Sequence, residues 1–321
     1  MQNILLVMTF ILGLFTIVTA GRYFVEAAIK LAHVTKIPEA IIGATLVSIA
    51  TTLPELSVST IAAHQNAQGI ALGNCAGTMI FNISFVLGIY LLVRSHSYKS
   101  RSSFVSKAII LFLASILLIV FGLDYFISIG EGVILLILFI AFVLDCITIA
   151  KSEIKKSQIV HPNNPKVNNK VLFELLIIFV LSAAALLVGA DLTVGSASEI
   201  AYLLGMSETA IGLTIVAMGT SLPEFITMIT SVMKKKSELG IANVIGANII
   251  NSTIIFGSST IIAGGFIVEK QTLFITLPAI LLITTILMAP ILIKNRTYRW
   301  QGALLLLIGV LYNVIILFNL V

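Results

Sequence analysis

Charged residues are scarce in this sequence. Only 10% of the 321 residues are Asp, Glu, Lys or Arg, whereas a soluble domain has roughly 25%. A chain this long with so few charges cannot cover itself with a hydrated surface, so a soluble globular protein is excluded. Hydrophobic residues make up 59% of the chain, and several apolar runs approach the ~20 residues that cross a bilayer. The sequence therefore predicts an integral membrane protein whose main partner is the lipid bilayer.

Three further features narrow the class of membrane protein. There are only two cysteines, Cys75 and Cys146, and both lie in apolar runs, so neither a disulfide framework nor a cysteine metal site is expected. Strand-period alternation is missing, so the membrane spans are predicted to be helices. The net charge of +5 comes from basic residues in short polar segments between the runs, so no nucleic-acid partner is expected. The predicted fold class is an all-α polytopic membrane protein.

The apolar runs predict ten transmembrane helices. Their expected ranges are 3–33, 38–63, 69–92, 104–122, 126–150, 171–203, 208–233, 238–263, 271–293 and 300–319. One polar segment, residues 151–170, is rich in Pro and Asn and reads as a linker. The chain is thus divided into residues 1–150, the linker 151–170 and residues 171–321.

The basic residues give this layout an orientation. Seventeen of the nineteen Lys and Arg residues fall on alternate loops or beside them, and Lys270 and Arg22 are the two exceptions. Cytoplasmic loops of membrane proteins carry the excess of basic residues. The prediction is a cell-membrane protein with the linker 151–170 in the cytoplasm and both termini outside.

The sequence also repeats itself after a shift of 169 residues. Residues 37–55 (IPEAIIGATLVSIATTLPE) align with 206–224 (MSETAIGLTIVAMGTSLPE), and nine of the nineteen positions are identical. The register continues without a gap, pairing Asn82 with Asn251. Each copy holds five predicted spans, an odd number, so the second copy must be inverted in the membrane. Inverted five-helix repeats with a site at their interface are typical of secondary transporters.

The repeated segment places Glu55 and Glu224 inside apolar spans. A charge at that depth costs about 2.5–3.5 kcal/mol on insertion scales. No Lys or Arg lies at a matching depth, so a bound cation is the simplest counter-charge. Such a glutamate could instead stay neutral by keeping its proton, but two glutamates in matched contexts favour an ion site.

Oxygen-rich neighbours accompany each glutamate. Hydroxyl groups lie three and four residues before it, on the same helix face. They belong to Thr51, Thr52, Thr220 and Ser221. Pro54 and Pro223 each remove one helical hydrogen bond and free a backbone carbonyl. Carboxylate, hydroxyl and carbonyl oxygens together suit a hard cation such as Ca²⁺ or Na⁺.

The third and eighth spans are predicted to face these segments. Asn74, Thr78 and Asn82 form one stripe on the third span, and the paired stripe on the eighth consists of Asn243, Ala247 and Asn251. Asn74 and Asn243 remain open, since an intramembrane asparagine serves hydrogen bonding between helices as readily as ion binding.

These motifs resemble the sodium/calcium exchangers of the cation/calcium antiporter superfamily. The match lies in GATLVSIATTLPEL…GNCAGTMIFNI and GLTIVAMGTSLPEF…ANVIGANIINS, and the span layout extends it to the whole chain. The resemblance implies antiport of Na⁺ and Ca²⁺ by alternating access, with the ions bound near the midplane between spans 2, 3, 7 and 8. It also implies that spans 1 and 6 slide across the other eight and that three Na⁺ exchange for one Ca²⁺.

The resemblance also assigns residues. Glu55 and Glu224 look like the central carboxylates, and Thr51, Thr52, Thr220, Ser221 and Thr78 like the hydroxyl ligands. Ser48 and Ala217 match positions that contribute backbone carbonyls, and Asn82 and Asn251 match the remaining polar positions. Na⁺ and Ca²⁺ are expected as transported ions, with no resident cofactor and no enzymatic activity. A monomer is expected.

Three positions depart from the resembled pattern. Asn251 stands where many relatives have Asp, Ala247 where Ser is frequent, and Met79 where Asn is usual. The first makes potassium dependence less expected, and the other two put the sodium sites in question. Ca²⁺/H⁺ exchange is therefore the alternative, and a passive cation channel would use the same oxygens without coupling. An intramembrane enzyme is disfavoured because no nucleophile, metal-binding His pair or phosphate-binding loop accompanies the two glutamates.

Overall fold

The computed structural model of the protein describes residues 2–35, 37–95, 101–160, 169–203 and 217–319. Long helices form its outer part: α1 (Gln2–Thr35), α7 (Arg101–Phe121), α8 (Ile129–Val160), α9 (Asn169–Leu203), α15 (Leu277–Lys294) and α16 (Arg299–Asn319). The inner helices are interrupted by π-helical turns, labelled η. The first half contains α2 (Glu39–Ile42), η1 (Gly43–Val47), α3 (Ser48–Thr51), α4 (Leu53–His64), α5 (Gln68–Phe81), η2 (Asn82–Leu87) and α6 (Gly88–Val93).

The second half has a matching set of inner helices. It comprises α11 (Ala217–Thr220), α12 (Leu222–Met233), α13 (Ser237–Ile250), η4 (Asn251–Ile255) and α14 (Phe256–Ile262), with η5 (Thr272–Thr276) before α15. The sequence shift that takes Glu55 to Glu224 takes the bounds of α3, α4 and α5 onto those of α11, α12 and α13. The turns η2 and η4 both begin at the paired asparagines, Asn82 and Asn251. The two copies thus share their local structure as well as their sequence.

The predicted spans can be compared with the described helices. Eight helices are long and apolar enough to cross a membrane, and the pair Glu39–Thr51 and Leu53–His64, bent by 44°, gives a ninth. The predicted seventh span, 208–233, begins outside the described residues. Most of the repeated segment 206–224 lies outside them as well. The described part is therefore a polytopic helical membrane protein.

The polar segment 151–170 begins as a helix, because α8 continues to Val160; residues 161–168 lie outside the described part. One basic residue, Lys107, does not lie in a loop. It lies within α7, fully buried, beside Asp145 and Cys146 of α8.

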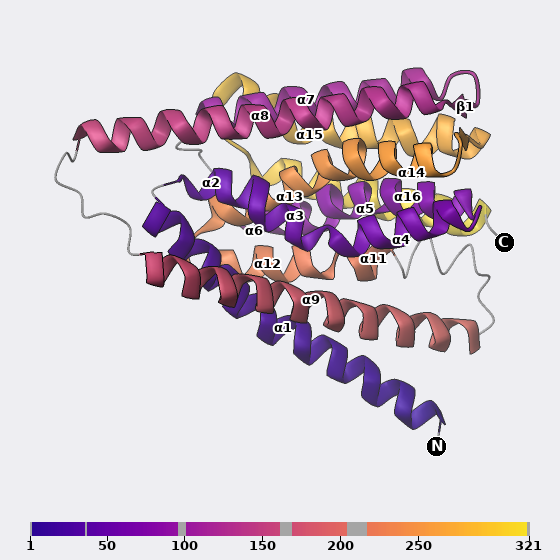
Figure 1. The fold of residues 1–321 in the computed structure, drawn as a ribbon. Coiled ribbons are helices and arrows are strands. Elements are labelled where there is room, and N and C mark those ends of the chain that lie inside the picture. The colour runs from indigo at the N-terminus through magenta and orange to yellow at the C-terminus, as the bar shows by residue number, and fades with distance from the viewer. Residues whose placement is uncertain (1, 36, 96–100, 161–168, 204–216, 320–321) are drawn as a thin grey trace.

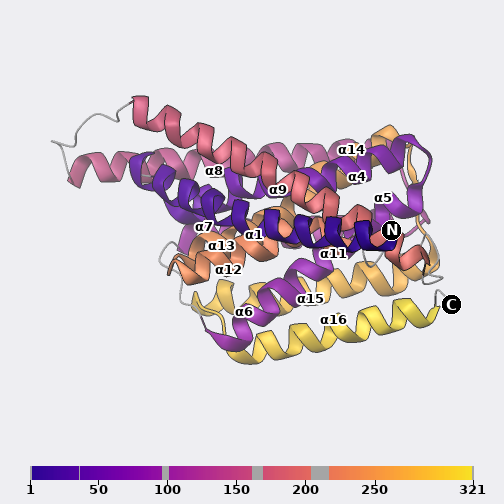
Figure 2. The ribbon, with the colours of Figure 1, turned by 90° about the horizontal axis from the view of Figure 1, so that it is seen from below.

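Helices α1 and α9 form a layer of their own. They pack along each other and run in opposite directions on one side of the bundle, while α7 and α8 lie on the opposite side (Figures 1 and 2). They meet closely at Gly13 and Gly189, where a Cβ atom on Gly189 would lie 3.0 Å from the Gly13 carbonyl oxygen. Two glycines thus allow the backbones of α1 and α9 to touch.

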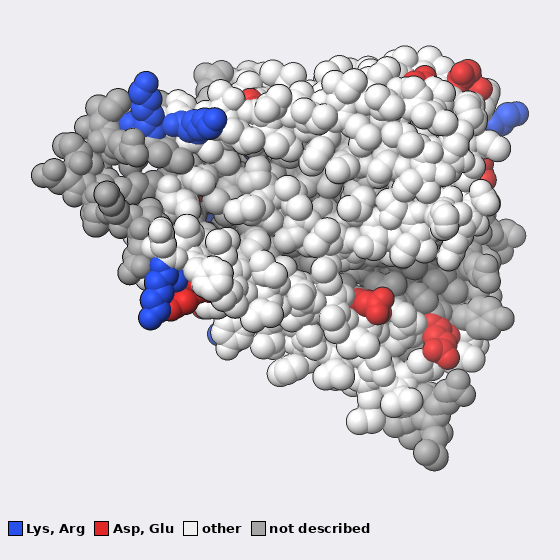
Figure 3. Space-filling view, viewed as in Figure 1, with Lys and Arg blue, Asp and Glu red and all other residues white. Residues whose placement is uncertain are grey.

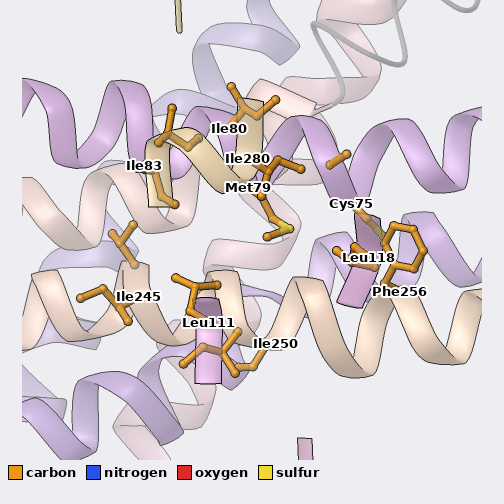
Figure 4. Close-up of a cluster of buried hydrophobic side chains, with 14 of the residues drawn as sticks. Cys75, Met79, Ile80, Ile83, Leu111, Leu118, Ile245, Ile250, Phe256 and Ile280 are labelled. Atoms are coloured by element: carbon orange, nitrogen blue, oxygen red, sulfur yellow. The ribbon is translucent and has the colours of Figure 1, made fainter. Parts of the chain in front are cut away.

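The apolar core joins the two halves. Figure 4 shows Met79 of α5 and Ile83 of η2 lying near Ile245 of α13, with Leu111 of α7 beside them. All of these side chains are fully or almost fully buried. This packing holds α5 and α13, the helices that carry the paired asparagines, side by side in the middle of the bundle.

Charge lies at the two ends of the molecule. Figure 3 shows a largely uncharged middle, with basic side chains gathered at the end where α8 finishes and α9 begins. At that end Lys234 pairs with Glu26 of α1, and Lys236 with Glu39 of α2 at 2.5 Å. We call it the basic end. At the opposite end, two short strands, β1 (Phe126–Ile127) and β2 (Phe266–Ile267), pair antiparallel outside the helices.

Candidate functional site: buried carboxylates between the two halves

Glu55 and Glu224 lie in the first turns of α4 and α12. The helix is interrupted at Thr52 (φ −88°, ψ 7°) and at Ser221 (φ −82°, ψ 0°), and Pro54 and Pro223 occupy the second position of the helix that follows. Each proline therefore lies in the first turn of a helix, where a backbone N–H would have no partner within the helix. The result places each carboxylate at a helix N-terminus, where the helix dipole favours negative charge.

Both glutamates are fully buried, and neither has a protein counter-charge in the described residues. The exposed fraction of each side chain is 0%. The two carboxylates lie close enough to repel each other when both are ionised. The one fully buried basic residue of the described chain, Lys107, neighbours Asp145 instead. Two carboxylates in this position need a cation or a proton.

The hydroxyls before each glutamate divide into two kinds. Thr52 Oγ1 donates to the Ser48 carbonyl at 2.7 Å, and Ser221 Oγ donates to the Ala217 carbonyl at 3.0 Å. The carbonyls of Ser48 and Ala217 are thus tied to these hydroxyls. In each case the hydroxyl donates its hydrogen to the carbonyl. The lone pairs of the hydroxyl oxygen remain available to accept a hydrogen bond or to bind a cation.

The other two hydroxyls cross between the halves. Thr51 Oγ1 can donate to Asn243 Oδ1 at 3.2 Å, and Thr220 Oγ1 to Asn74 Oδ1 at 3.4 Å. Each of these hydroxyls also lies within hydrogen-bond distance of a carbonyl on its own helix, that of Ser48 at 3.4 Å and that of Ala217 at 3.3 Å. Thr51 also lies beside the Glu224 carboxylate, so each half reaches into the other. Asn74 in turn donates to the Glu55 carbonyl at 3.3 Å and to Ser59 at 2.9 Å. Of the two interpretations left open for Asn74 and Asn243, these bonds support hydrogen bonding between helices.

Asn248 is a residue that the sequence interpretation missed. Its Nδ2 donates to the Met79 carbonyl at 3.3 Å, and its Oδ1 accepts from Asn82 at 3.2 Å, joining α5 to α13. The repeat could not reveal it because Met79 occupies the paired position in the first half. The signal that could have found it is a third asparagine within one apolar helix.

Several oxygens of the predicted site remain unpaired. Among the predicted site residues, seven side-chain oxygens have no hydrogen-bond partner in the described part: both of Glu55, both of Glu224, and those of Thr78, Asn82 and Asn251. All five residues are 0% exposed. Buried polar groups are normally paired, so such a set indicates a missing partner. Ca²⁺ takes six to eight oxygen ligands, and these oxygens match that kind and number.

The structure places all eleven predicted site residues in the interior, at 0–2% exposure. It brings Glu55, Glu224 and Thr51 together and links the paired halves through asparagines. No hydrogen bond in the described chain joins Thr78 or Asn251 to either carboxylate, so their place around an ion remains a prediction. The arrangement as a whole can hold hard cations between the halves without help from a protein cation.

Comparison with known proteins also indicates a cation exchanger. The family model described as "Sodium/calcium exchanger protein" matches residues 5–147 and 174–318. Sodium/calcium exchanger MaX1 of Methanosarcina acetivorans is 30% identical, over 96% of this chain and 97% of its own. Inner membrane protein YrbG of Escherichia coli is 32% identical, over 79% of each chain.

Solved structures of a sodium-calcium exchanger share the fold of this chain. The sodium-calcium exchanger NCX_Mj soaked with 10 mM Na⁺ and zero Ca²⁺ superposes with a TM-score of 0.83 at 29% sequence identity, over 96% of this chain and 98% of that one. The same protein soaked with 2.5 mM Na⁺ and 0.1 mM Sr²⁺ gives a TM-score of 0.82 at 28% identity, with the same coverage. The fold is therefore shared along nearly the whole chain.

Proposed function

Because the chain belongs to the sodium/calcium exchanger family, we propose that it is a secondary active antiporter that exchanges Na⁺ for Ca²⁺ by alternating access. The observation that carries the proposal is the pair Glu55 and Glu224, fully buried, close together and without a protein counter-charge among the described residues. The ions would bind between α3–α4, α5–η2, α11–α12 and α13–η4, which correspond to predicted spans 2, 3, 7 and 8.

Exchange follows from the charge of such a site. Two carboxylates are neutralised by one Ca²⁺ or by about two Na⁺, and an uncompensated pair is costly inside a bilayer. The loaded protein can therefore change conformation, whereas the empty one cannot do so cheaply. Because Ca²⁺ and Na⁺ would use the same oxygens, each displaces the other. These two properties couple the outward movement of one ion to the inward movement of the other.

The repeat supplies two related gates. We propose that the two five-helix halves are inverted in the membrane, with the basic end in the cytoplasm and both termini outside. The opposed directions of α1 and α9 and the matching helix bounds support this arrangement. Movement of α1 and α9 across the remaining helices would open the site to each side in turn. Their glycine contact at Gly13 and Gly189 holds α1 and α9 together, as a joint movement of the two helices requires.

The direct test is radiolabelled Ca²⁺ uptake into proteoliposomes that contain the purified protein. Liposomes loaded with Na⁺ and diluted into choline medium should take up Ca²⁺ severalfold faster than liposomes loaded with choline, because outward Na⁺ flow drives inward Ca²⁺ flow. Equal uptake in the two preparations would contradict Na⁺/Ca²⁺ exchange.

Ca²⁺/H⁺ exchange is the second candidate. It is favoured by Asn251, a neutral amide whose side-chain atoms are buried and unpaired in the described residues, and by Ala247, which offers no oxygen opposite Thr78. Fewer oxygens would weaken sodium binding and leave the proton as the competing ion. Ca²⁺ uptake driven by a pH gradient in sodium-free medium would identify this activity, and uptake indifferent to that gradient would exclude it.

A further inference from the structure

A row of unpaired hydroxyls leads away from Glu224 along α12. Thr227 and Ser231 follow Glu224 at helical spacings of three and seven residues, so all three side chains lie on one face. Each is 0% exposed, and neither hydroxyl has a hydrogen-bond partner in the described part of the chain. We call Thr227 and Ser231 the α12 hydroxyl pair.

A Ser or Thr in a helix often donates to the carbonyl four residues earlier. Thr60 of α4 does so at 2.6 Å to Leu56, and the buried Thr260 of α14 does so at 2.8 Å to Phe256. The α12 hydroxyl pair lacks this bond although both side chains are 0% exposed. Four other buried hydroxyls of the described chain also lack a partner, those of Thr78, Ser84, Ser259 and Thr284, but Thr227 and Ser231 share one helix face with a site carboxylate. The oxygens of the α12 hydroxyl pair are therefore available to a ligand that moves through the interior.

The pair lies between the candidate site and the basic end. From Glu224 to Ser231 the helix advances about 10 Å at its normal rise. Half of a bilayer's hydrocarbon core measures about 15 Å. Three residues after Ser231 the basic turn Lys234–Lys236 begins. Its ion pairs with Glu26 and Glu39 lie at the surface of the basic end. The hydroxyls thus cover most of the depth between the carboxylate and that surface.

Helix α13 forms the other wall. Asn243 Nδ2 has no partner among the described residues, and one turn nearer the basic end Gly240 presents no side chain. A Cβ atom on Gly240 would lie 3.0 Å from Ser231 Cβ, so the α13 backbone borders the hydroxyl pair directly. The interface of α12 and α13 is therefore closely packed at this level, with Met228 Sδ 2.7 Å from the same Cβ position and the Ser231 side chain beside it.

The first half has no equivalent. The positions paired with Thr227 and Ser231 are Val58 and Ala62, which carry no polar atom on their side chains. Ser59 is the polar residue nearby, and its hydroxyl is engaged by Asn74 at 2.9 Å and by Cys75 at 3.3 Å. Of the two paired helices α4 and α12, only α12 thus carries unpaired buried hydroxyls beyond its glutamate, so this feature is not part of the repeat.

We propose that Thr227 and Ser231 line the passage by which a transported cation moves between Glu224 and the basic end, their oxygens replacing water ligands as it sheds its hydration shell. The inference rests on the proposed exchange activity. On α4, the positions that would serve the opposite side in the same way are the apolar Val58 and Ala62. The two faces of the protein therefore differ in how they admit the ion.

The test compares the two faces separately. Thr227→Val and Ser231→Ala each remove a hydroxyl with little change of shape, and Thr227→Ser keeps the hydroxyl at position 227. Thr60→Val on α4 is the matched control, because the Thr60 hydroxyl is already paired with the Leu56 carbonyl. Sodium-dependent Ca²⁺ flux is measured with Ca²⁺ added to either face of the proteoliposome. A cleavable tag after α16, which ends opposite the basic end, reports the protein's orientation (Figure 1).

The double variant should raise the half-saturating Ca²⁺ concentration about three- to tenfold at the basic end, as expected for lost hydrogen-bond-strength contacts, and leave it unchanged at the other face. Thr227→Ser and Thr60→Val should behave as the unmodified protein. Unchanged values at both faces, or equal changes at both, would overturn the passage while the exchange activity stands. Absence of sodium-dependent flux in the unmodified protein would instead reject the proposed function.

Discussion

Glu55→Gln and Glu224→Gln should each reduce sodium-driven Ca²⁺ uptake about 100-fold, the factor that corresponds to the cost of one uncompensated charge inside a bilayer. With one carboxylate replaced, bound Ca²⁺ leaves a net positive charge in a fully buried site. Glutamine keeps the size of the side chain and one oxygen, so the loss reports the charge. Initial uptake rates in proteoliposomes at equal protein content measure the effect.

The matched control is Glu174→Gln. Glu174 is an exposed acidic residue of α9, outside the pair of buried carboxylates, and its neutralisation should leave uptake unchanged. The glutamine variants should elute as the unmodified protein does in size-exclusion chromatography. Uptake retained in either buried variant would contradict a site that depends on both carboxylates.

Gly246→Ala should damage both the stability of the protein and its Ca²⁺ uptake. A Cβ atom at this position would lie 2.7 Å from both the Ala44 carbonyl oxygen and Ser48 Oγ. The first of these atoms belongs to the backbone of η1, so relief requires α13 to move away from η1. That movement would separate Asn243 from Thr51, the bond that joins the halves beside Glu224. Overpacking of this kind costs about 1–3 kcal/mol.

The expected result is a lower midpoint of thermal unfolding in detergent together with a loss of Ca²⁺ uptake. Gly69→Ala is the control, because nothing lies within 4 Å of a Cβ atom there. Alanine is favoured over glycine in helices by about 1 kcal/mol, so this variant should be as stable as the unmodified protein or more so. If Gly246→Ala and Gly69→Ala had the same unfolding midpoint and the same Ca²⁺ uptake, the close contact between α13 and η1 would not be needed for stability or transport.

The central carboxylates could be predicted from the sequence for an energetic reason. An acidic residue within an apolar run needs compensation, and Glu55 and Glu224 recur in matched surroundings. The same argument placed the hydroxyls of Thr51 and Thr220 beside them. The structure adds that each of these threonines bonds to the other half of the protein, a contact that no local pattern encodes.

Other features could not be predicted because they depend on tertiary packing. Asn248 bonds to Asn82 and to the Met79 carbonyl, partners that only the packing of α5 against α13 brings within reach. Lys107 falls within the predicted span 104–122, but only the packing of α7 shows that it is buried beside Asp145. The prolines were expected to remove a hydrogen bond within a span. The structure adds that the helix breaks just before each proline, at Thr52 and Ser221, so that each glutamate lies in the first turn of a new helix.

The central claim is that Ca²⁺ and Na⁺ bind to the same buried oxygens. Calorimetric titration of the purified protein with Ca²⁺, in choline medium and in sodium medium of equal ionic strength, tests it directly. The apparent Ca²⁺ affinity should fall progressively as Na⁺ replaces choline, and Ca²⁺ binding should disappear in Glu55→Gln and Glu224→Gln. A Ca²⁺ affinity that does not change with Na⁺ concentration, or binding that survives both substitutions, would contradict the shared site.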